Sequence, residues 1–210
     1  MADYKTIRGV STYEYEEKRS RFIATAAFAD TEEKAVAHLN RVRAANRTAR
    51  HNVYAYVLRE GGRTRYSDDG EPAKTAGTPV LEAIGHAGLS DVIVVVTRYF
   101  GGILLGTGGL VRAYTAAASG ALQNAELVTM RLVTDCSVTV SYPQFEQAQR
   151  IIAAQQIDAG VAHGREQKGF VVDDLFLPKP YKAILHHVFG TVGVATQIVH
   201  GIKAQRPIEF

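Results

Sequence analysis

The stretch VVVTRYFGGILLGTGGLVRAY, residues 94–114, decides how the first half of the chain is interpreted. It begins with β-branched apolar residues, which predict a strand covered on at least one face, and it ends with the apolar spacing of an amphipathic helix. Between the two lie five glycines in nine positions, namely Gly101, Gly102, Gly106, Gly108 and Gly109. Arg98 precedes this loop and Arg112 follows it. The stretch therefore predicts a strand, a glycine-dense loop and a helix, with an arginine on each side of the loop.

The glycine loop has the chemistry of an anion site but matches no known phosphate loop. Glycines allow backbone N–H groups to approach an anion, and a helix that starts after them adds the positive end of its dipole. No lysine precedes Thr107, so this is not a Walker A loop, and Val111 stands where the dinucleotide fingerprint needs a glycine. Two interpretations stay open here: anion binding, or close packing of helix and strand through a tight turn.

Bulk composition describes an ordinary globular protein. The chain has 210 residues, of which 46% are hydrophobic and 21% charged, enough for one large or two small domains. Its single cysteine, Cys136, excludes an intrachain disulfide and a cysteine-based zinc site. No run resembles a signal peptide or approaches the ~18 apolar residues of a membrane span, so we expect a cytoplasmic protein without a membrane partner. The net charge is +3, and arginines crowd residues 41–50 and 59–65, which favours an anionic partner or a solvated charged surface.

Periodicity and turn signals extend the N-terminal element order on both sides of the glycine loop. We predict strands at 20–29, 52–59, 63–66 and 91–96, and helices at 31–46, from 78 and at 108–124. Asp30 and Glu33 have the spacing of a capping box for the first helix, and Thr78 is the expected cap of the second. The expected buried positions of the first helix are Val36, Leu39 and Val42. Those of the last helix are Leu110, Tyr114, Ala117, Ala118, Ala121 and Leu122.

A second domain is predicted where the composition changes near Arg131. From there the patterns indicate strand 132–140, helix 143–155, strands 158–165 and 169–177, helix 180–189 and strand 196–203. This βαββαβ order is typical of a ferredoxin-like domain. We therefore expect an α+β protein with two domains, at residues 1–131 and 132–210.

An acidic block, SDDGE at residues 67–71, is the second candidate for chemistry. Asp68, Asp69 and Glu71 can hold Mg²⁺ or act as acid and base, although their spacing matches no calcium loop. The alternative is an acidic turn that caps and orders the neighbouring loop and helix. His51, behind Arg50, can shuttle a proton or serve the structure. From this pattern we assign no catalytic residue and no metal site, and we expect no cofactor.

Several of these motifs together resemble the YigZ/IMPACT family. The match rests on RYFGG at 98–102, LG at 105–106 and GGLVRAY at 108–114, and on SDDGEP at 67–72 with TAG at 75–77. KRSRF at 18–22 and HN at 51–52 with YAY at 54–56 are weaker matches, and the resemblance covers almost the whole chain. The chain departs from the family pattern at Lys74, where a small residue is common, at Val53, where cysteine is common, and at Leu104, where lysine is common. Relative to the family pattern, the chain thus loses a positive charge in the glycine loop, at Leu104, and gains one beside the acidic block, at Lys74.

The resemblance implies a fold and a field of function. The N-terminal domain would be a mixed sheet packed with helices, related to the fourth domain of elongation factor G, and the C-terminal domain would resemble that factor's fifth, ferredoxin-like domain. Eukaryotic members of the family act in translational control, where they compete with a starvation-sensing kinase for its activator protein. Nucleic-acid binding has been suggested for bacterial relatives.

Our leading hypothesis is a non-enzymatic protein that binds RNA, the ribosome or a translation-associated protein. The candidate binding residues are Arg50, His51, Asp68, Asp69, Glu71, Lys74, Arg98, Tyr99, Phe100, Gly101, Gly102, Gly106, Gly108, Gly109, Arg112 and Tyr114. In this hypothesis Arg98 and Arg112 contact phosphate and the aromatic residues stack on bases. A metal-dependent enzyme using the acidic block and a pure protein-interaction module are the alternatives. Arg98 has an alternative role too, as the salt-bridge partner of the acidic block.

Overall fold

The structure is a computed structural model that describes residues 3–141, 146, 149–150, 158–162, 169–177 and 196–205. The chain divides into two compact units, and each is described by itself. The N-terminal unit contains Tyr4–Thr129, and the C-terminal unit contains Met130–Gln205. No helix among the described residues is long and apolar enough to cross a membrane.

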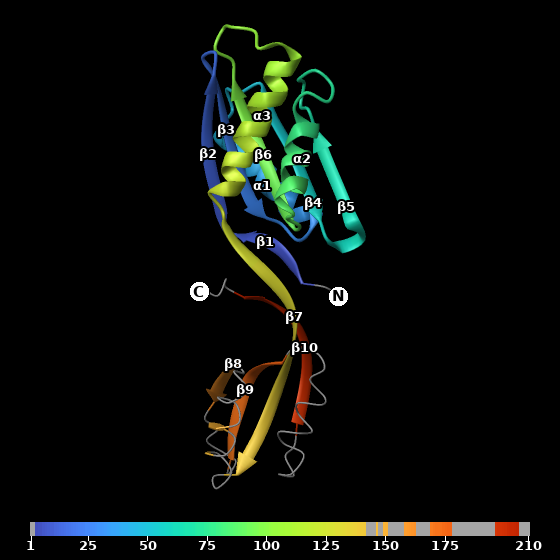
Figure 1. Ribbon diagram of the computed structural model, residues 1–210, viewed down its shortest axis with the longest axis vertical. Coiled ribbons are helices and arrows are strands. Elements are labelled where there is room, and N and C mark those ends of the chain that lie inside the picture. Colours follow the sequence, from blue (N-terminus) through green and yellow to red (C-terminus); the bar gives the residue numbers. More distant parts are fainter. Residues whose placement is uncertain are drawn as a thin grey trace. The chain divides into compact units, whose positions relative to one another are not determined.

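The N-terminal unit is built on a five-stranded sheet (Figure 1). Its strands, in spatial order, are β2 (Val10–Glu17), β3 (Ser20–Phe28), β6 (Val92–Tyr99), β4 (His51–Leu58) and β5 (Arg63–Ser67). All four pairings are antiparallel, so the expected mixture of strand directions is wrong. The reason is that β3 and β4, which run in the same direction, are separated by β6, which pairs antiparallel with both.

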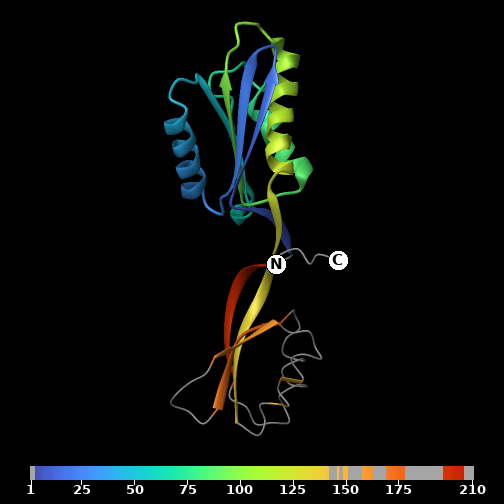
Figure 2. The same ribbon diagram turned by 90° about the vertical axis from the view of Figure 1, so that its left-hand side faces the viewer.

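Helices cover both faces of this sheet (Figure 2). One face is covered by α1 (Glu32–Ala45), and the other by α2 (Gly77–Ala87) and α3 (Gly106–Gln123). Alternate side chains of β6 enter the two cores: Val94 packs under α2 and α3, whereas Ile93 packs under α1. The run VIVVV is therefore fully buried, which confirms the prediction of a central covered strand.

The first helix differs from its prediction in its cap and in its buried face. Thr31 is the N-cap and accepts a hydrogen bond from Lys34 N at 3.3 Å, whereas Asp30 pairs with the Lys34 ammonium group. Val36 is 40% exposed, and His38 is buried in its place. His38 lies three residues after the buried Ala35, so the two share one face of the helix and a polar residue continues the apolar stripe. The Nε2 atom of His38 lies 3.2 Å from Thr25 Oγ1.

The last helix matches its prediction closely. α3 begins at Gly106, two residues before the expected start, and every residue of its predicted buried face is buried. Three elements were not predicted: β1 (Tyr4–Arg8), β2 and the short 3₁₀ helix η1 (Glu60–Gly62). Strand β1 is joined to the unit by a parallel bridge between Lys5 and Leu89.

The C-terminal unit contains most of β7 (Glu126–Ser141), together with β8 (Asp158–Ala162), β9 (Gly169–Leu177) and β10 (Thr196–Gln205), and each of these overlaps a predicted strand. Strand β7 begins six residues before its predicted start at 132, so its first residues, up to Thr129, belong to the N-terminal unit. The strand order is β8-β9-β7, with β10 also paired to β7. The predicted helices at 143–155 and 180–189 lie outside the described residues, apart from residues 146 and 149–150, which are helical. The ferredoxin-like assignment and the boundary at 131/132 therefore stay predictions.

Candidate functional site

Four connections meet at one end of the N-terminal sheet, which we call the loop end. They are the β2–β3 turn at 18–19, the α1–β4 connection at 46–50, the β5–α2 connection at 68–76 and the β6–α3 connection at 100–105. The register explains their meeting, because His51 at the start of β4 pairs with Arg98 at the end of β6, and Arg21 of β3 pairs with Tyr99. All the predicted site residues lie on these connections or in the strands and helices that the connections join.

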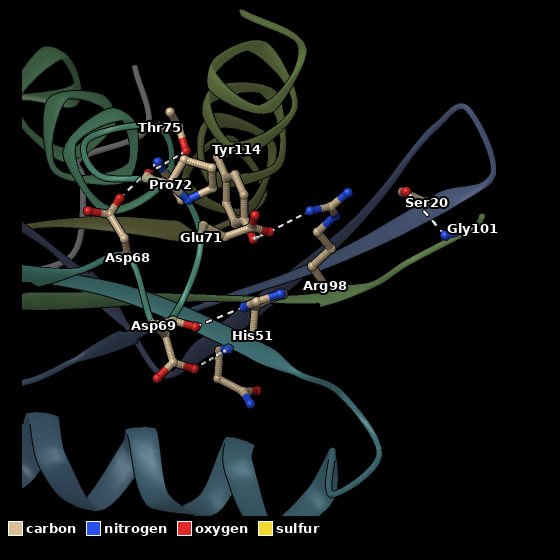
Figure 3. Close-up of polar contacts among 12 residues, drawn as sticks. Ser20, His51, Asp68, Asp69, Glu71, Pro72, Thr75, Arg98, Gly101 and Tyr114 are labelled. Atoms are coloured by element: carbon tan, nitrogen blue, oxygen red, sulfur yellow. Dashed lines mark hydrogen bonds and ion pairs between the residues drawn. The ribbon is translucent and has the colours of Figure 1, made fainter. Parts of the chain in front are cut away.

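Arg98 lies beneath the loop end rather than on it. Its NH1 group donates to Glu71 Oε1 at 2.6 Å, and the two side chains are only 8% and 4% exposed (Figure 3). Tyr114 Oη donates to the same oxygen at 2.9 Å. The expectation that Arg98 projects freely toward phosphate is wrong, and the alternative of a salt bridge to the acidic block is what the structure has. Burial, and then the charge of Glu71, raise the pKa of the Tyr114 phenol, so this hydroxyl keeps its proton as a donor.

The Asp68 carboxylate holds the start of α2. It accepts hydrogen bonds from the backbone N–H groups of Lys74, Ala76 and Gly77 at 3.0, 3.0 and 2.8 Å. The N–H groups of Ala76 and Gly77 are free donors at the N-terminus of α2, where a negative charge is stabilising, and that of Lys74 lies in the loop before it. The prediction that the acidic block orders the neighbouring loop and helix is therefore confirmed. Thr78 is not the cap, because Asp68 performs this role from the preceding loop.

Asp69 binds in a third direction. Its carboxylate accepts from Arg43 NH2 at 2.9 Å and from Asn52 N at 2.6 Å, and its carbonyl oxygen lies 2.8 Å from His51 Nδ1. Asp68, Asp69 and Glu71 thus point to three different partners (Figure 3). Within the part of the chain that the structure describes, no group of three or more His, Cys, Asp or Glu side chains could hold a metal ion. Each carboxylate already has a structural partner.

Gly101 joins two of the motifs in space. Its backbone N donates to Ser20 Oγ at 3.2 Å, and a Cβ atom on Gly101 would overlap the carbonyl of Arg19. KRSRF and RYFGG, far apart in sequence, therefore pack directly on each other, and only glycine fits at the contact. Gly102 has φ +85°, a conformation that also favours glycine. The three remaining glycines of the loop lie in the first turn of α3.

The two aromatic residues after Arg98 differ in what they offer. Tyr99 is half-buried, donates from its hydroxyl to Asn46 Oδ1 at 2.8 Å, and has the Arg21 guanidinium 5.6 Å from its ring centroid. Phe100 is 55% exposed, and the Arg98 guanidinium lies 5.6 Å from its ring. Of the two rings, Phe100 is the one with a surface open to a partner.

Exposed cations gather at and beside the loop end. They are Lys18, Arg19, Arg47, Arg50, Lys74 and Arg112. None of the six forms a salt bridge within the described residues. Sequence reasoning placed Arg50, Lys74 and Arg112 in the site but left Lys18, Arg19 and Arg47 out. The signal that could have found Lys18 and Arg19 was the KRSRF match, which identified the segment without assigning its chemistry.

Fold and site together define a class: a protein of two units whose N-terminal α+β unit carries a glycine-rich, basic loop end above a buried Arg98–Glu71 pair. The Impact N-terminal domain model matches residues 18–122, which span the whole site from the β2–β3 turn to α3. The chain belongs to the IMPACT family.

Individual relatives support the assignment over more of the chain. An IMPACT family member from Thermus thermophilus is 43% identical over 148 residues, which cover 70% of this chain and 79% of the relative. IMPACT family member YigZ of Escherichia coli is 37% identical over 166 residues, 77% of this chain and 79% of the relative. A crystal structure of a hypothetical protein is similar with a TM-score of 0.62 and 32% identity, covering 95% of this chain and 98% of the other.

Proposed function

We propose that this protein binds RNA through the loop end and acts in translation or its regulation in the cytoplasm, without catalysing a reaction. The observation that carries the proposal is the group of exposed cations at and beside the loop end that lack acidic partners within the described residues. Family membership supports the field of function, because the resemblance to IMPACT proteins implies translational control.

The geometry divides the arginines of the signature into two roles. Arg98 holds Glu71 and so fixes the acidic connection from below, whereas Arg112 stands exposed on α3. Phosphate groups are bound by exposed lysine and arginine side chains, and arginine can bind them with two parallel hydrogen bonds. We therefore assign phosphate contact to Arg112 and the other exposed cations, and a supporting role to Arg98.

The two alternatives have less support. An enzyme built on Asp68, Asp69 and Glu71 would have to release these carboxylates from the contacts that order the loop and α2. A pure protein-interaction module would use the same surface with an acidic protein partner. A pull-down from lysate with and without RNase separates this alternative from the proposal, because RNA binding predicts that the captured partner is lost after RNase treatment.

The proposal is tested by the salt dependence of RNA affinity. Fluorescence anisotropy with a labelled single-stranded RNA should give a steep fall of log K with log salt, at about −0.7 for each phosphate that a cation neutralises. Arg112→Ala should remove about one such contact from the slope. Arg63→Ala is the matched control, because Arg63 is exposed at the start of β5, away from the loop end. An Arg112→Ala slope equal to wild type, or no RNA binding at moderate salt, would refute the proposal.

For the C-terminal unit we propose a ferredoxin-like domain that begins at residue 132. The strand order, with β7 between β9 and β10, supports this assignment. Expression of residues 132–210 alone tests it: a dispersed amide NMR spectrum is expected, and a collapsed spectrum would argue against the boundary.

A further inference from the structure

We infer that Ile103 and Leu104 form an apolar wedge that contacts unpaired bases, while the Lys18–Arg19 turn binds the neighbouring phosphates. The ligand class is therefore RNA with unpaired nucleotides, such as a single strand, a loop or a junction, rather than continuous duplex. This inference rests on the proposed function and names the residues and the RNA form that it requires.

The wedge is the most exposed apolar segment at the loop end. Leu104 is 82% exposed and Ile103 is 42% exposed, next to Phe100 at 55%. Large apolar side chains that leave a surface together are typical of interaction sites. The segment is held at its base, because Gly101 packs on Arg19 and Leu105 is buried at the start of α3. The protein thus fixes both ends of the segment and leaves its two aliphatic side chains in solvent.

Backbone strain marks the basic turn beside the wedge. Lys18 has φ +46° and Arg19 has φ +64°, and together they form the two-residue connection of the β2–β3 hairpin. Such turns strongly favour Asn-Gly or Gly-containing pairs, because side chains other than glycine and asparagine disfavour positive φ. Lys74, on the β5–α2 connection, has φ +62°. Non-glycine residues held at positive φ tend to cluster at functional sites, and here three of them are exposed cations at the loop end.

RNA fits this combination better than a protein partner does. The cores of protein interfaces are depleted in lysine, whereas here the wedge has only two aliphatic residues and the neighbouring turn contains Lys18. Apolar side chains that enter between bases are an established way to engage nucleic acid. In duplex RNA the base faces are stacked on one another and the major groove is deep and narrow, so a short apolar wedge can pack on base faces only where bases are unpaired.

The inference is tested with two labelled RNAs of equal length, one an unpaired oligonucleotide and one a perfect duplex. Wild-type protein should bind the unpaired RNA more tightly. Leu104→Ala should lower that affinity about fivefold without changing the salt slope, because it removes an apolar contact and no charge. Lys18→Ala with Arg19→Ala should reduce the slope by about two contacts of 0.7 each. Leu127→Ala is the matched control, since Leu127 is 48% exposed on β7.

The results separate RNA binding by the loop end from base contact by Ile103 and Leu104. If no RNA binds, the proposed function fails and this inference fails with it. If RNA binds with a cation-dependent slope but Leu104→Ala behaves as wild type, or if duplex binds as tightly as unpaired RNA, the proposed function stands and the wedge is refuted. If a partner resists RNase and is lost only in Leu104→Ala, the segment binds protein, which also refutes the inference.

Discussion

Each end of the N-terminal sheet contains a buried carboxylate paired with an arginine, but the surfaces above the two pairs differ. At the loop end a buried acid, Glu71, is paired with Arg98 at 2.6 Å. At the opposite end a buried acid, Asp91, accepts from Arg59 N at 2.7 Å and lies 3.6 Å from the Arg59 guanidinium. That guanidinium in turn covers the ring of Tyr4 at 4.6 Å.

The difference lies in what surrounds each pair. Beside Arg59 and Asp91 a neighbouring hydroxyl group is buried and paired internally, because Thr6 Oγ1 donates to the Asp91 carbonyl at 3.2 Å. Around Arg98 and Glu71 the loops present exposed apolar side chains, and cations that have no acidic partner among the described residues. A buried arginine–carboxylate pair therefore occurs at both ends of this sheet, and the two ends differ in the surface above the pair.

The largest expected effect is the loss of the Arg98–Glu71 pair. Arg98→Ala leaves the Glu71 carboxylate, 4% exposed, without its charged partner, and such unpaired buried charges cost about 3–5 kcal/mol. Urea unfolding followed by tyrosine fluorescence measures the change. The double variant Arg98→Ala with Glu71→Ala should recover part of the loss, because it removes the unpaired charge. A single variant as stable as Arg63→Ala would show that the pair is not structural.

A smaller effect is expected at the opposite end. Asp91→Asn keeps a side-chain oxygen for Arg59 N and tolerates the φ of +56°, but it removes the charge that faces a partly exposed arginine. We expect a loss of about 1–2 kcal/mol in the free energy of unfolding, less than for Arg98→Ala. Equal losses for the two variants would remove the distinction between a fully buried and a partly exposed pair.

The cap of α2 is expected to contribute less again. Asp68→Asn keeps one acceptor of the cap but loses the charge at the helix N-terminus, so we expect a loss of about 1 kcal/mol. Hydrogen exchange should show the effect first at the amides of Lys74, Ala76 and Gly77. Unchanged protection of these amides would mean that the carboxylate is not their partner in solution.

The smallest expected effect is a change in a titration. Burial, followed by the hydrogen bond to Asp91, raises the pKa of Tyr4 to about 12. The folded state therefore keeps this proton between pH 10 and 12 while the unfolded state loses it, so the contribution to stability is complete below pH 10 and is lost as the pH rises toward 12. Asp91→Asn should lower this pKa. Phenolate absorbance, with Tyr4→Phe subtracted to isolate the residue, measures the shift, and an unchanged value in Asp91→Asn would contradict the contact.

The elements that the sequence predicts well are those with a strong periodic pattern. The apolar run of β6 and the buried face of α3 were recognised because their spacing follows burial directly. Strand β2, VSTYEYEE, was missed because it is an edge strand whose side chains are mostly exposed or half-buried, so no clear alternation is visible. The caps of α1 and α2 were misplaced because several acceptors compete locally and tertiary contacts choose between them.

The candidate site was predictable in its membership but not in its geometry. The motifs named segments that the fold brings together at one end of the sheet. Whether Arg98 faces solvent or Glu71 depends on how the 68–76 connection brings Glu71 to β6 and α3, a long-range arrangement that no local pattern contains. Lys18 and Arg19 form a tight hairpin turn because both residues have positive φ. A lysine–arginine pair does not predict such a turn, since turns of this kind favour asparagine and glycine.

The central position of β6 has a consequence for how the protein is made. Of the five strands in its sheet it is the last to be synthesised, yet it pairs with both β3 and β4. Until Tyr99 has left the ribosome, these two earlier strands have no partner on their inner edges, and the apolar faces that α2 and α3 will cover stay in water. Long-range antiparallel pairings of this kind form slowly, and unpaired strand edges invite aggregation in the meantime. The nascent N-terminal unit therefore keeps unpaired strand edges and uncovered apolar surface until the glycine loop and α3 have emerged.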